Sequence, residues 1–75
     1  MLIKELEKKI IADKIPLDLY SLNGGLPNEK FCIEKIEEKW QTYYSERGLK
    51  SKIKIFNSEE DACKYFYELL SKTFK

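Results

Sequence analysis

Apolar and polar residues alternate along this chain in segments of different period. Between residues 2 and 14 the apolar side chains recur at helical spacing, and Pro16 interrupts that pattern, so we expect a helix there. Residues 16–30 are rich in Asn, Gly and Pro and form a long connection, within which residues 17–22 can make either a short helical turn or a strand.

Three short segments with the composition of strands follow. Residues 30–36 hold Phe and Ile, and residues 40–46 carry three aromatic side chains. Residues 52–56 alternate between Lys and Ile and end on Phe56. Gly48 follows the aromatic segment and is expected to supply a positive φ in a hairpin turn. This spacing predicts an antiparallel meander with residues 40–46 in the middle.

The last segment is the clearest helix. Ser58 and Asp61 fit a capping box, and Glu59 and Glu60 add negative charge to the first turn, where the helix dipole favours it. Apolar side chains cover about 200° of the helix circumference, which is roughly twice the usual stripe. We therefore expect this helix to contact two surfaces.

The segments together predict one domain over residues 1–75. Their order is α-β-β-β-α, which favours a two-layer α+β fold. We expect a three-stranded antiparallel meander with both helices on one face and the other face bare. A chain of this length buries only about 60–65% of its unfolded surface, which is sufficient for folding.

Charge narrows the classes of partner. The chain has 14 basic and 13 acidic residues and a net charge of +1, so no strong field attracts nucleic acid or an anionic membrane. Charges begin at Lys4, and no apolar run reaches the length of a bilayer span. We expect a cytoplasmic protein without a membrane segment, either a monomer or a homodimer.

The sequence offers little catalytic chemistry. It contains no histidine, which excludes histidine-based nucleophile pairs and histidine metal ligands. Cys32 and Cys63 lie far apart among apolar neighbours and are interpreted as buried small hydrophobic residues, with their redox state left open. We predict no catalytic residue, no metal site and no cofactor, and hence no enzyme.

A mixed aromatic and basic surface is the best candidate for binding. Alternation puts Tyr43 on one face of its strand and Tyr44 on the other, and the sequence does not decide which one faces outward. Three lysines of the following strand are expected to share one face: Lys50, Lys52 and Lys54. Such lysines are typical of a solvated edge strand, but beside an outward tyrosine they could also bind RNA or an acidic protein.

One short string carries a family resemblance. Tyr43-Tyr44-Ser45-Glu46-Arg47-Gly48, preceded by Trp40, together with residues 21–25 and the start of the last helix, resembles small bacterial proteins of Firmicutes type associated with immunity to polymorphic toxins. The resemblance implies a protein that binds and blocks a cognate toxin without catalysis. The nearly neutral charge departs from strongly acidic immunity proteins and argues against a nuclease toxin.

We therefore predict a non-enzymatic protein-binding module, specifically an immunity protein for a cognate bacterial toxin. The alternative is a small RNA-binding domain that uses the lysine and tyrosine face of the sheet. The predicted partner-binding residues are Trp40, Tyr43, Tyr44, Glu46, Arg47, Lys50, Lys52 and Lys54.

Overall fold

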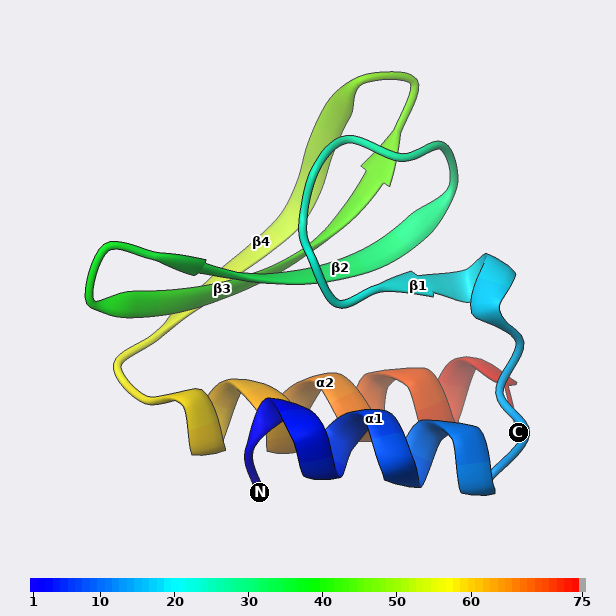
Figure 1. Cartoon of the computed structure of the whole chain (residues 1–75). Helices are drawn as coiled ribbons and strands as arrows, with labels where there is room; N and C mark the ends of the chain where they lie inside the picture. Colours follow the sequence, from blue (N-terminus) through cyan, green and yellow to red (C-terminus); the bar gives the residue numbers. More distant parts are fainter. Residues whose placement is uncertain (75) are drawn as a thin grey trace.

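Two helices and a four-stranded sheet make up the computed structural model, which describes residues 1–74 (Figure 1). The elements are α1 (Ile3–Ala12), the 3₁₀ helix η1 (Leu17–Leu19), β1 (Tyr20–Ser21), β2 (Lys30–Ile36), β3 (Lys39–Glu46), β4 (Leu49–Phe56) and α2 (Glu59–Phe74). The prediction of an α+β fold is confirmed.

The sheet differs from the expected three-stranded antiparallel meander. Its order is β1-β2-β3-β4, with β2, β3 and β4 antiparallel and β1 parallel to β2. The additional strand comes from residues 17–22, which make both a helical turn and a strand. Tyr20 anchors this short strand because its side chain is buried. A parallel pairing of two residues leaves no periodicity in the sequence, so the pattern could not predict it.

The two faces of the sheet have different coverings. Figure 1 shows α1 and α2 side by side beneath the sheet, on the side that we call the helix face. Ile33 pairs with Thr42 on this face, whereas Cys32 pairs with Tyr43 on the opposite side, called the far face. The faces therefore follow directly from the register of β2 and β3.

The core lies between the helices and the helix face. Leu6 and Ile10 of α1, Phe66 and Leu70 of α2, and Ile33 of β2 are all 0% exposed and form one cluster. Burying each such side chain contributes about 1.5–3 kcal/mol. The wide apolar arc of α2 is accounted for by its contacts with both α1 and the sheet.

Both helix starts are capped, but by a shared set of side chains. Asp61 donates its backbone N–H to Ser58 Oγ at 3.1 Å, as the capping pattern predicts. Glu59 accepts the backbone N–H of Ile3 at 2.8 Å, and Glu60 pairs with the N-terminal ammonium at 3.3 Å. The acidic start of α2 therefore also satisfies the start of α1, which holds the two helices together at this end.

Thr42 supports the first stability prediction. Its side chain is 1% exposed on the helix face, and its hydroxyl has no hydrogen-bond partner within residues 1–74. We expect Thr42→Val to leave the free energy of unfolding unchanged or to raise it by about 1 kcal/mol, because an unpaired buried hydroxyl is costly. Urea unfolding measures the change.

The matched control is Thr73→Val. Thr73 is exposed and its hydroxyl donates to the Leu69 carbonyl at 2.9 Å, so this variant should change stability by less than about 0.5 kcal/mol. If Thr42→Val, but not Thr73→Val, lowers the free energy of unfolding by more than about 1 kcal/mol, the Thr42 hydroxyl has a hydrogen-bond partner and its description as unpaired is wrong.

Candidate protein-binding surface

A β-bulge in β4 decides where the lysines lie. The pairing of β3 with β4 shifts by one residue between Thr42 and Tyr44, and Lys52 adopts a φ of 55° at the shift. Lys54 pairs with Thr42 on the helix face, whereas Lys50 pairs with Ser45 on the far face. The expected single face of Lys50, Lys52 and Lys54 is therefore wrong, because one inserted residue reverses the alternation.

Two of these lysines have partners within the fold. The ammonium of Lys50 lies 3.2 Å from the Glu34 carboxylate and 4.6 Å from the centroid of the Tyr43 ring. Lys54 places its ammonium 4.6 Å from the ring centroid of Tyr65, which belongs to α2. Lys50 and Lys54 therefore contact different partners on opposite faces of the sheet.

Tyr43 answers the question of which tyrosine turns away from the helices. It lies on the far face but is only 1% exposed, and its hydroxyl donates to the Gly25 carbonyl at 2.6 Å. The connection between β1 and β2 folds back against the far face here (Figure 1). Gly24 in that connection is buried against the Glu34 side chain. The expected bare far face with an outward tyrosine is therefore wrong in this half of the sheet.

The other predicted binding residues do not gather into one patch. Tyr44 is half-buried on the helix face, with its ring centroid 4.8 Å from that of Phe31. Trp40 is also half-buried and packs against the core. Glu46 and Arg47 are exposed at the hairpin between β3 and β4. Thus no described face combines an exposed tyrosine with the three lysines.

The turn of this hairpin matches its prediction. Arg47 and Gly48 have φ values of 52° and 77°, the paired positive values typical of a tight two-residue hairpin. Arg47 also donates its backbone N–H to the side chain of Asn28 at 3.3 Å, which ties the hairpin to the connection before β2.

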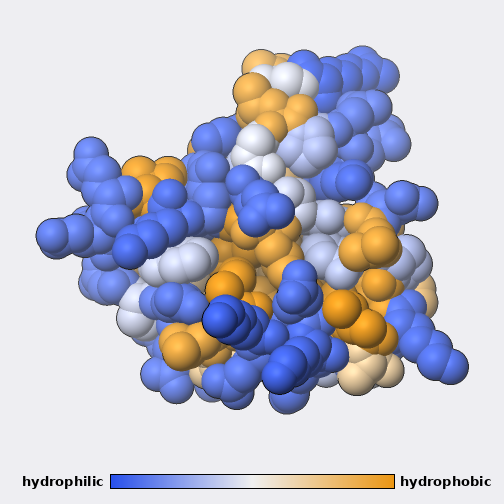
Figure 2. All heavy atoms as spheres, viewed as in Figure 1, coloured by the Kyte–Doolittle hydropathy of each residue, from blue (hydrophilic) through white to orange (hydrophobic). Residues whose placement is uncertain are grey.

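The uncovered half of the far face exposes isoleucine instead of tyrosine. Ile36 is 40% exposed, Ile53 is 51% exposed and Ile55 is 64% exposed. The register puts all three on the far face, and we call them the isoleucine surface. Figure 2, which has the viewpoint of Figure 1, shows hydrophilic atoms over most of that side of the molecule and apolar atoms in separate groups among them.

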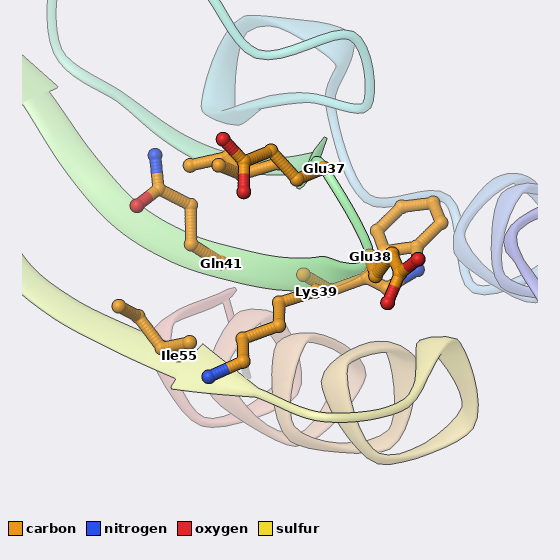
Figure 3. Close-up of a pocket in the computed structure, with 7 residues that line it drawn as sticks. Glu37, Glu38, Lys39, Gln41 and Ile55 are labelled. Carbon is orange, nitrogen blue, oxygen red and sulfur yellow. The ribbon is translucent and has the colours of Figure 1, made fainter.

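A shallow hollow of about 410 Å³ adjoins this surface. Its lining residues are Ile36, Glu37, Glu38, Lys39, Trp40, Gln41 and Ile55. Figure 3, viewed with the helices behind the sheet, shows Lys39, Gln41 and Ile55 projecting from the neighbouring strands β3 and β4. The hollow therefore combines an apolar floor with charged groups around it.

Glu34 forms the polar border between the covered and uncovered halves. Its carboxylate accepts a hydrogen bond from Gln41 Nε2 at 2.5 Å and pairs with Lys50. These partners hold Gln41 beside Ile55, its neighbour in the register. The isoleucine surface is thus bounded by an ordered polar group on one side.

Sequence reasoning missed this surface although its signal was present. The alternation of Lys and Ile over residues 52–55 indicates that Ile53 and Ile55 share a face. It does not indicate which face the helices cover, and apolar residues are ordinarily assigned to the inside. The helices instead lie on the side of Lys54 and Phe56, so the two isoleucines face outward.

Neither cysteine is available for chemistry at the surface. Cys32 and Cys63 are free thiols with 0% exposure, and they form no disulfide. Burial raises the pKa of the Cys32 thiol, and burial raises the pKa of Cys63 to about 11. The interpretation of both as buried hydrophobic residues is confirmed.

The raised pKa of the buried Cys63 thiol leads us to expect a loss of stability at alkaline pH. An unfolded thiol ionises near pH 8.5, whereas Cys63 stays protonated to about pH 11 in the folded chain. Above about pH 9 the unfolded state binds fewer protons, so the free energy of unfolding should fall as pH rises toward 11. Urea midpoints from pH 7 to pH 10.5 measure this, and Cys63→Ala should flatten the profile. An identical slope in Cys63→Ala would contradict the assignment.

Comparison with known proteins adds no family to this description. Neither family models nor curated proteins nor solved structures match the chain. Within residues 1–74, no cluster of three or more potential metal-ligating side chains occurs, and neither helix combines the length and apolar character of a membrane span.

Proposed function

We propose that this chain is a non-enzymatic protein-binding module whose partner rests on the isoleucine surface. The observation that carries the proposal is the exposure of Ile36, Ile53 and Ile55 on a sheet face that has no helix layer. Exposed apolar groups bordered by polar side chains are typical of protein interfaces. The Glu34, Gln41 and Lys50 group supplies such a border.

The hollow beside this surface supports the same function. Trp40 lines it from β3, and tryptophan is enriched among the residues that contribute most to binding energy. An apolar side chain of a partner that enters the hollow would contact Ile36 and Ile55 on the far face. Trp40 also lines the hollow, although the register puts its side chain on the helix face. The proposal thus retains Trp40 among the predicted binding residues and replaces the two tyrosines with isoleucines.

The test compares two equally exposed isoleucines. Ile55 is 64% exposed on the far face, and Ile11 is 61% exposed on α1. The partner is first recovered from the source cells, identified and purified. Calorimetry with that partner should then show that Ile55→Asp weakens binding at least about 30-fold, equivalent to about 2 kcal/mol, whereas Ile11→Asp changes it less than about threefold. Equal affinities of both variants would rule out the isoleucine surface.

The narrower expectation of a toxin partner rests on the motif from Trp40 to Gly48. It stays a prediction, and its test is whether the purified partner is a large secreted protein whose toxicity this chain suppresses in co-expression. Growth inhibition that persists in the presence of the chain would exclude the immunity role while leaving protein binding in place.

A further inference from the structure

The outer edge of β4 is unpaired. The sheet order ends with β4, and no strand within residues 1–74 lies beyond it. All its residues from Leu49 to Ile55 are exposed. An edge of this kind presents backbone N–H and C=O groups to any extended segment that can lie beside it.

The two sides of this edge have different chemistry. Ile53 and Ile55 project from the far face, whereas Lys54 projects from the helix face. The bulge at Lys52 interrupts the regular geometry, so the uninterrupted part of the edge runs from residue 53 to residue 56. No acidic residue occurs between Arg47 and Phe56. The edge therefore has an apolar side and a basic side.

A second copy of this chain fits the edge poorly. Pairing of β4 with another β4 would bring the lysines of both copies together: Lys50, Lys52 and Lys54. Like charges across neighbouring strands are destabilising, and edge lysines are a known obstacle to such pairing. The charge of the edge selects an acidic partner instead.

We infer that β4 binds an extended segment of a partner protein in which acidic and apolar residues alternate. This inference rests on the proposed function. Added as a fifth strand, the segment would direct its apolar side chains toward Ile53 and Ile55 and its acidic side chains toward Lys54, and Lys52 follows at the bulge next to the paired residues. Its apolar residues would extend the isoleucine surface outward, and the bulge would limit regular pairing to about four residues.

The experiment uses synthetic peptides and the full chain labelled with ¹⁵N. The probe is a capped peptide of eight alternating Glu and Val residues, and one control is the same peptide with N-methyl groups on every second residue, which removes backbone donors without changing charge. The Glu-Val peptide should shift the amide resonances of residues 53–56 and slow exchange of the outward amides at least about tenfold. The N-methylated peptide and a Lys-Val peptide should do neither.

Variants of the chain test separately how much the lysine charges contribute to peptide affinity. Lys52→Glu combined with Lys54→Glu should reduce the peptide affinity at least about tenfold, and Ile11→Asp should leave it unchanged. Equal binding of the N-methylated peptide overturns strand addition. The inference is also overturned if a ten-nucleotide single-stranded RNA competes with the peptide and shifts the same amide resonances. A dimer formed through β4, detected by sedimentation equilibrium, would overturn it as well.

The two proposals fail in different ways. If the purified partner depends on Ile55 but protects no amide of residues 53–56 from exchange, strand addition is wrong and the isoleucine surface remains. If partner affinity is unchanged in Ile55→Asp, the proposed function is wrong whatever the peptides do.

Discussion

Phe66→Ala is expected to remove a large part of this protein's free energy of unfolding. Phe66 is 0% exposed at the centre of the cluster that joins α2 to α1 and the sheet. Removing a buried phenylalanine ring costs about 3–5 kcal/mol, through lost burial and the cavity left behind. A domain of this size has a total stability of about 4–11 kcal/mol, so the variant loses much of it. Urea unfolding followed by circular dichroism measures the shift in midpoint.

Phe74→Ala is the matched control on the same helix. Phe74 is 43% exposed near the end of α2, so its removal should cost less than about 1 kcal/mol. Similar losses in the two variants would mean that α2 does not bury the face assigned to it. A loss confined to Phe66→Ala supports the described packing.

Gly24→Ala should produce the second large effect. Gly24 has a φ of 69°, where alanine is disfavoured by about 1–2 kcal/mol. A Cβ atom at Gly24 would also lie 2.8 Å from Glu34 Cβ, an overlap that adds about 1–3 kcal/mol. The connection must then lift from the far face and break the hydrogen bond from Tyr43 to Gly25.

The adjacent glycine separates the two causes. Gly25 has a φ of 85°, but its added Cβ would meet only Pro27 Cδ, at 3.9 Å. Gly25→Ala should therefore cost only the backbone strain of about 1–2 kcal/mol. Thiol labelling supplies an independent readout: Cys32 should become reactive in Gly24→Ala, while Cys63 stays protected in the core. If Cys32 remains protected, the connection has not lifted from the far face in Gly24→Ala, and the expected effect of the added Cβ atom is wrong.

The local sequence pattern was sufficient to predict the main helices and strands. It was not sufficient to predict which side chains lie on each face of the sheet. Ser58, the wide apolar arc of α2 and the Arg47-Gly48 turn each carry their information within a few residues, so the corresponding structures were predicted. The parallel pairing of β1 with β2 and the bulge at Lys52 depend on contacts between distant segments. That bulge alone divided the predicted lysine face, because one extra residue reverses the alternation.

The sequence by itself determined the α+β class, the three longer strands with their hairpin turn, and the absence of histidine chemistry. These properties follow from composition and from periodicity over short distances. Tertiary structure alone decided that the connection covers Tyr43 and that Ile36, Ile53 and Ile55 face solvent. The physical reason is that alternation groups side chains into two faces, whereas only packing against the helices and the connection selects which face is buried.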